Sequence, residues 1–110
     1  MRGGVAPLAV VVGLLIAGCG GGGPAQADRN RAVTEAAVAY HKAKASGTNL
    51  GPGPCIAEQL PGLPDWVVDV AHDPRQPVDD KPANQCQRYR STEAHHFVEL
   101  DPQGKLLRAQ

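Results

Sequence analysis

The chain has 110 residues, which is at most one domain. Its 11 lysine and arginine residues balance 11 aspartate and glutamate residues, so the formal net charge is zero. Because nucleic acid and anionic lipid attract proteins with a basic surplus, this balance excludes a nucleic-acid-binding function.

The first predicted element is an apolar segment near the amino terminus, residues 5–17 (VAPLAVVVGLLIA). A helix that spans a bilayer needs roughly 20 residues, so this segment is too short for a permanent anchor. It has the length of the apolar region of a signal peptide. The segment runs into Ile16-Ala17-Gly18-Cys19, and four glycines follow the cysteine.

This motif resembles the lipobox of bacterial lipoproteins, in which an aliphatic residue and two small residues precede a cysteine. The resemblance covers residues 1–19. It implies that residues 1–18 are a signal peptide and that Cys19, linked to diacylglycerol, becomes the new amino terminus. It also implies a lipid anchor in the cell membrane or outer membrane, facing an oxidising extracytoplasmic compartment. Residues 19–27 are then the lipidated cysteine and a Gly-rich tether, with an r.m.s. reach of roughly 15 Å.

A second cleavage pattern leaves an alternative open. Ala25-Gln26-Ala27 is an A-x-A sequence of the kind that an ordinary signal peptidase cuts, which would release a soluble secreted protein that begins at Asp28.

Two further cysteines, Cys55 and Cys86, form an even pair once Cys19 is lipidated or removed. In an oxidising compartment such a pair predicts a disulfide. On the chain-entropy model it would stabilise the fold by roughly 3–4 kcal/mol. A metal or redox site built from the two thiols is the alternative, but they lack the C-x-x-C spacing.

The body of the chain opens with a predicted helix over residues 28–46, with Asp28 as its N-cap and Gly47 as its C′ residue. Its apolar stripe follows helical spacing and comprises Val33, Ala36, Ala37, Tyr40 and the stem of Lys44.

Residues 55–60 are expected to form a short helical turn, and the β-branched run of residues 66–72 predicts a strand. The alternation of a strand places Trp66, Val68, Val70 and His72 on one face, and Val67, Asp69 and Ala71 on the other. Residues 73–84 carry three prolines and are predicted to be an irregular loop.

The final elements form a hairpin, with strands over residues 95–100 and 105–109 joined by the turn Asp101-Pro102-Gln103-Gly104. Residues 28–110 are therefore predicted to be a small α+β domain, with one N-terminal helix packed on a small antiparallel sheet, a C-terminal hairpin and one disulfide.

One group of side chains suggests chemistry. Histidines and carboxylates are the usual ligands of zinc and other divalent ions, and His72, His95 and Glu99 are the candidates. Adjacent strand residues point to opposite faces, so His95 and His96 cannot serve one ion, whereas His95 and Glu99 share a face. They would meet His72 if the two strands were neighbours. The alternative is that these side chains are structural or exposed.

The chain has no G-x-S-x-G nucleophile motif and no phosphate-binding glycine pattern. We therefore predict a membrane-anchored extracytoplasmic lipoprotein that acts as a binding or structural module of the cell envelope, with no cofactor and with an envelope protein or ligand as its partner. The alternatives are a divalent-metal-binding or hydrolytic domain and a soluble protein cleaved after Ala27.

Overall fold

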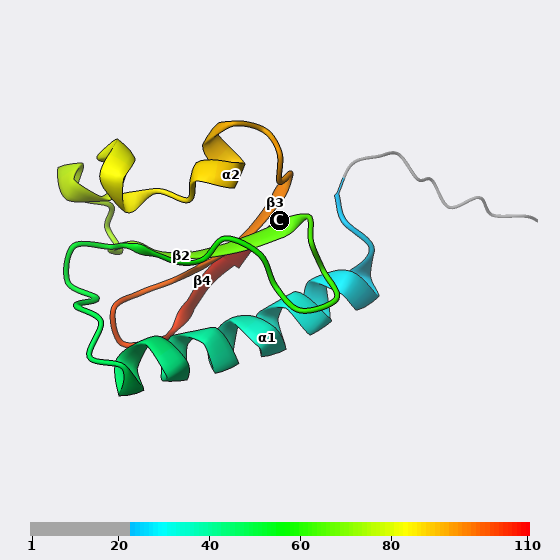
Figure 1. The fold of residues 1–110 in the computed structure, drawn as a ribbon, viewed down its shortest axis with the longest axis horizontal. Helices are drawn as coiled ribbons and strands as arrows, with labels where there is room; N and C mark the ends of the chain where they lie inside the picture. The colour runs from blue at the N-terminus through cyan, green and yellow to red at the C-terminus, as the bar shows by residue number, and fades with distance from the viewer. Residues whose placement is uncertain (1–22) are drawn as a thin grey trace, which may run out of the picture.

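The computed structural model describes residues 23–110, and the predicted signal peptide, Cys19 and the first residues of the tether lie outside the described residues. In chain order the elements are α1 (Gln26–Ala45), β1 (Cys55–Ala57), β2 (Trp66–Val70), two 3-10 helices (Pro77–Asp80 and Pro82–Asn84), α2 (Gln87–Arg90), β3 (His96–Leu100) and β4 (Leu106–Ala109). One main helix packs on a four-stranded sheet (Figure 1), which confirms the predicted α+β class.

Helix α1 begins two residues earlier than predicted. Ala25, not Asp28, is the N-cap residue, and it makes no side-chain capping bond. Gln26 and Ala27, the last two residues of the predicted tether, are good helix formers and make up the start of the helix. Asp28 lies in the first turn, where its charge complements the helix dipole. The predicted end is confirmed, since Gly47 follows the helix with a φ of 79°.

The buried face of α1 differs from the predicted stripe. Ala32, Ala36 and Tyr40 are buried, whereas Ala37 and Lys44 are exposed. The buried residues follow one another at intervals of four, the spacing that keeps side chains on one face of a helix. The small alanines allow the helix to lie close to the sheet.

The strand order is β1-β2-β3-β4, but the sheet is mixed and not antiparallel as predicted. The two outer pairs are antiparallel, and the central pair β2–β3 is parallel. A parallel pair needs a long crossover connection, and residues 71–95 provide it. The prediction for residues 55–60 is also wrong, since Cys55–Ala57 pairs with β2 as a strand and does not form the expected helical turn.

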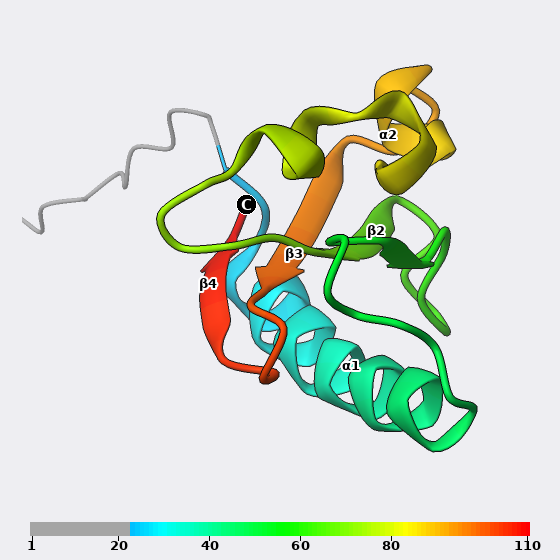
Figure 2. The ribbon, with the colours of Figure 1, turned by 90° about the vertical axis from the view of Figure 1, so that its left-hand side faces the viewer.

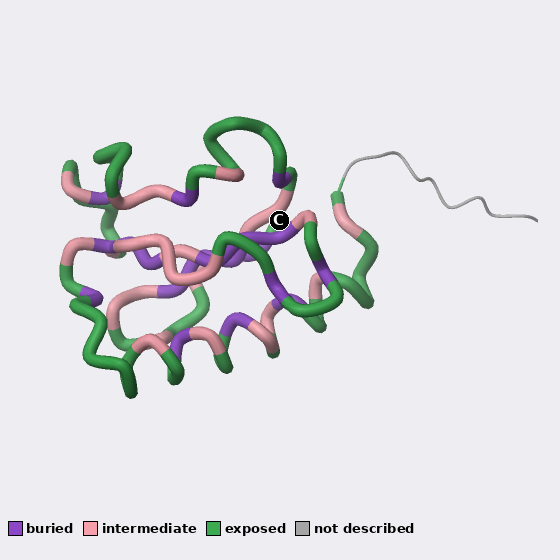
Figure 3. Tube along the Cα trace, in the orientation of Figure 1, coloured by how far each residue is buried: buried purple, intermediate pink, exposed green. Residues whose placement is uncertain are grey.

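The inner face of the sheet and α1 form the main core (Figure 3). On β2 the predicted alternation is confirmed, because Trp66, Val68 and Val70 belong to this core. Val67 belongs instead to a smaller cluster with Cys86 and Ala94 on the other side of the sheet.

The crossover covers the outer face of the sheet, so α1 and α2 lie on opposite sides of it (Figure 2). The predicted irregular loop contains the two 3-10 helices. The predicted disulfide between Cys55 and Cys86 is confirmed, with an S–S distance of 2.06 Å, and joins β1 to the start of α2. The crossover is thereby held against the sheet.

The buried carboxylate of Asp79 fixes the middle of the crossover. It accepts hydrogen bonds from the backbone N–H groups of Gln76 (2.8 Å) and His72 (3.1 Å), and its Oδ1 lies 2.9 Å from Nδ1 of His72. Burial by itself would raise the pKa of Asp79, but these hydrogen bonds outweigh burial and lower the pKa below its usual value of 3.8.

The predicted C-terminal hairpin is confirmed. Oδ1 of Asp101 accepts hydrogen bonds from the backbone N–H groups of Gln103 and Lys105, and Gly104 completes the turn with a φ of 91°. The hydroxyl of Tyr40 donates to the carbonyl of Pro102 at 2.9 Å, which attaches the turn to α1.

Candidate functional site

The structure does not bring the three predicted metal ligands together: His72 and Glu99 line one small cavity, but His95 lies away from it. In the parallel β2–β3 pair, Trp66 lies opposite His96 and Val70 lies opposite Leu100. His95 therefore lies at the end of the pair where β3 begins, and His72 lies beyond the end where β2 finishes. An antiparallel pair would have placed these two histidines at the same end, so the parallel direction separates them.

Each of the three predicted ligands has a partner of its own. Nδ1 of His72 bonds to Asp79, and Nδ1 of the exposed His95 lies 2.7 Å from Oδ1 of Asp65. Glu99 forms ion pairs with arginine side chains.

Within residues 23–110, the group of three potential ligands close enough to share an ion is Cys55, Glu58 and Cys86. Cysteine binds a metal ion as the thiolate, but these two sulfurs are bonded to each other. This group therefore does not form a metal site in the oxidised protein.

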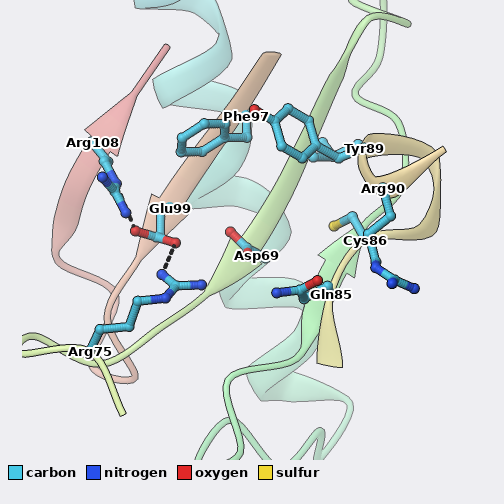
Figure 4. Close-up of a pocket in the computed structure, with 10 residues that line it drawn as sticks. Asp69, Arg75, Gln85, Cys86, Tyr89, Arg90, Phe97, Glu99 and Arg108 are labelled. Carbon is cyan, nitrogen blue, oxygen red and sulfur yellow. Dashed lines mark hydrogen bonds and ion pairs between the residues drawn. The ribbon is translucent and has the colours of Figure 1, made fainter. Parts of the chain in front are cut away.

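A pocket of about 490 Å³ lies on the outer face of the sheet, where the crossover covers it (Figure 4). The strands supply the floor and the crossover supplies the facing wall. Its lining residues are Val67, Asp69, Phe97, Glu99 and Arg108 from the sheet, and Arg75, Gln85, Cys86, Tyr89 and Arg90 from the crossover.

Glu99 is the most heavily paired charge of the pocket floor, and only 4% of its surface is exposed. Its Oε2 accepts a hydrogen bond from Nη1 of Arg75, and its Oε1 accepts one from Nε of Arg108, both at 2.9 Å. Arg108 lies directly opposite Glu99 across the β3–β4 pair, a register that favours opposite charges. The carboxylate of Glu99 is therefore fully neutralised by groups of the protein itself.

Asp69 lies beside this network, on the neighbouring strand β2. In the sheet it is paired with Cys55 of β1 on one side and Glu99 of β3 on the other. Its Oδ1 is buried and has no hydrogen-bond partner among the described residues. Burial raises the pKa of Asp69 to about 7, and the negative charge of Glu99 acts in the same direction. At neutral pH this carboxyl is present in both its protonated and ionised forms.

An aromatic pair forms the upper wall of the pocket in Figure 4. The rings of Tyr89 and Phe97 meet edge to face, with their centroids 5.3 Å apart. The guanidinium of Arg108 lies 5.8 Å from the centroid of the Phe97 ring, whereas 43% of Tyr89 is exposed. Tyr89 therefore offers an aromatic surface to a ligand.

Strand alternation predicts Asp69 on the face opposite Trp66, but the metal hypothesis did not include this residue. The sequence signal for a functional residue was a single carboxylate within the run WVVDV, in which every other side chain is apolar. A charged residue at the centre of such a strand needs a partner or a function.

The comparisons with known proteins give no function for this chain. The chain matches no family model, no curated protein and no solved structure. Among residues 23–110, no helix combines the length and the apolar character that a membrane crossing requires.

Proposed function

We propose that this chain is a membrane-anchored extracytoplasmic lipoprotein, that its folded domain is a binding module, and that the pocket at Asp69 is its binding site. The observation that carries the binding site is the buried Oδ1 of Asp69, which no group of the described residues satisfies. An unpaired buried carboxyl costs folding free energy, and such groups are concentrated at functional sites.

The anchor is supported by the sequence Ile16-Ala17-Gly18-Cys19, which resembles a lipobox. A disulfide between Cys55 and Cys86 agrees with export to an oxidising compartment.

The secreted alternative requires cleavage after Ala27, which would remove the first two residues of α1. One of these two residues is Gln26, whose side chain donates a hydrogen bond to Asn30 at 2.9 Å. Cleavage before Cys19 leaves the helix complete, and this favours the lipid-anchored form.

The anchor is tested by producing the full chain and its Cys19→Ser variant in a bacterial host that acylates lipoproteins. We expect the parent protein to enter the detergent phase on phase separation and to carry the mass of a diacylglyceryl group. The Cys19→Ser variant should lack both properties. A mature protein that begins at Asp28 without fatty acid would refute the anchor and establish the secreted form.

The binding site is tested separately by screening small polar fragments against the mature protein with proton–nitrogen correlation NMR. We expect the shifts to concentrate on the backbone signals of Asp69, Tyr89 and Phe97, and to disappear in an Asp69→Leu variant. An Asp73→Asn variant, which removes one exposed carboxylate from the adjoining loop, serves as the matched control. Fragments that bind elsewhere, or that bind the Asp69→Leu variant equally well, would refute the assignment.

A further inference from the structure

The charges around the pocket restrict the class of ligand that it accepts, provided that the pocket is the proposed binding site. The floor carries two carboxyls, Asp69 and Glu99, and two guanidiniums, Arg75 and Arg108, lie beside them. With all four ionised, these charges cancel, and the guanidinium of Arg90, which also lines the pocket, extends away from them in Figure 4. The ligand must therefore satisfy Asp69 without bringing an uncompensated charge into a half-enclosed space.

A cationic ligand fits poorly. An ammonium or guanidinium group that approached Asp69 would come within the field of Arg75 and Arg108, which already act on the Asp69 carboxyl.

An anionic ligand also fits poorly, because it would approach both carboxyls of the floor. Glu99 by itself already disfavours a second negative charge at Asp69. The guanidiniums of Arg75 and Arg108 are turned towards Glu99, as the dashed contacts in Figure 4 show, so an anion would compete with an existing ion pair.

A neutral hydroxyl group satisfies the site in every protonation state. It donates to the carboxylate when Asp69 is ionised and accepts from the carboxyl when Asp69 is protonated. Gln85 stands on the facing wall of the pocket, where its amide nitrogen donates to the carbonyl of Asp79 at 3.4 Å and its amide oxygen can accept from a hydroxyl. Several hydroxyls on one small molecule would therefore find complementary groups on both sides of the cavity.

The aromatic wall narrows the class of neutral ligand further, to molecules with a saturated ring. The C–H groups of a saturated ring carry a partial positive charge and pack well on the negative face of an aromatic ring, and Tyr89 has such a surface exposed. The cavity volume of about 490 Å³ falls within the range of small-molecule sites.

We propose that the pocket binds a neutral sugar ring, with its hydroxyls on Asp69 and Gln85 and its apolar face on Tyr89. The protein would thus be a glycan-binding lipoprotein.

Three matched probes test this inference on the mature lipoprotein held in zwitterionic micelles free of glycoside detergent. Glucose is the neutral ring, glucosamine carries an added ammonium group, and glucuronate carries an added carboxylate. We expect glucose to bind with millimolar affinity and at least about tenfold more tightly than either charged probe. The shifts should fall on Asp69, Gln85 and Tyr89.

Two variants separate binding from folding. Asp69→Leu should abolish sugar binding while leaving the fold at least as stable as the parent, because it removes a buried carboxyl. Tyr89→Ala should weaken binding without changing the Asp69 carboxyl signal, and the Asp73→Asn control should bind as the parent does.

A preference for glucosamine or glucuronate would refute the neutral class but leave the pocket as a binding site. Binding of the fragments described above without binding of any neutral sugar would likewise refute only this inference. Binding of neither fragments nor sugars would refute the proposed binding site as well.

Discussion

Replacement of Asp69 by asparagine removes the charge of the buried carboxyl and preserves its shape. The pKa of Asp69 rises from 3.8 to about 7 on folding, mainly because burial disfavours the ionised form. Between these two values the folded protein holds a proton that the unfolded chain has released. Raising the pH through this interval therefore destabilises the parent protein, and above pH 7 the cost of the ionised carboxyl is complete and constant.

The size of this cost follows from the shift. One pKa unit corresponds to about 1.4 kcal/mol, so a rise of about three units corresponds to up to about 4 kcal/mol. The amide that replaces the carboxyl does not ionise, and the variant escapes this cost. We expect Asp69→Asn to have nearly the stability of the parent at low pH and to be more stable by up to about 4 kcal/mol above pH 7.

Urea unfolding of the parent and the variant, measured from about pH 4.5 to about pH 8, gives the free energy of unfolding of each protein. The difference between them should grow as the pH rises to about 7 and then level off. Asp73→Asn, which removes an exposed carboxylate, should leave the pH dependence of the parent unchanged. A constant difference between the Asp69→Asn variant and the parent, or a difference that shrinks as the pH rises, would refute the reasoning.

Three further predictions concern the framework that supports the pocket. Reduction of the disulfide, or replacement of Cys55 and Cys86 by serine, should lower the free energy of unfolding by roughly 3–4 kcal/mol, and reduction should not affect the serine variant further. Asp79→Ala should cost about 3 kcal/mol, because three hydrogen bonds lose their acceptor. Because folding lowers the pKa of Asp79 below 3.8, its contribution is complete above that pH and is lost as the pH falls through the lowered pKa, so acid unfolding of the parent and the variant should converge. Gly104→Ala should lower the melting temperature, since the added Cβ would lie 2.8 Å from the ring of Tyr40 at a φ of 91°; an unchanged melting temperature would contradict the packing described for the turn.

The two acids of the pocket floor, Asp69 and Glu99, differ in their partners. Among the described residues that line the pocket, only Asp69 has a buried oxygen without a hydrogen-bond partner. Glu99 on the neighbouring strand has two arginines and contributes to the framework. Because of this difference between adjacent acids, we propose a binding role for Asp69 and only a structural role for Glu99.

The sequence by itself determined the elements whose signals are local. Helical spacing of apolar residues indicated α1, alternation in WVVDV indicated β2 and its two faces, and the turn from Asp101 to Gly104 indicated the hairpin. The pairing of Cys55 with Cys86 needed only the number of cysteines left after Cys19. Such features depend on a few neighbouring residues or on composition, so no knowledge of distant contacts is required.

Only the tertiary structure decided how these elements pair and what covers them. The direction of β3 relative to β2 is set by the crossover, and that direction separates His72 from His95, which the sequence had grouped as metal ligands. The same crossover lies over Asp69 and turns a strand residue with a known face into the buried floor of a pocket. Alternation along a strand fixes which side a residue faces, but the groups that it meets there come from segments far away in the chain, and local patterns do not encode them.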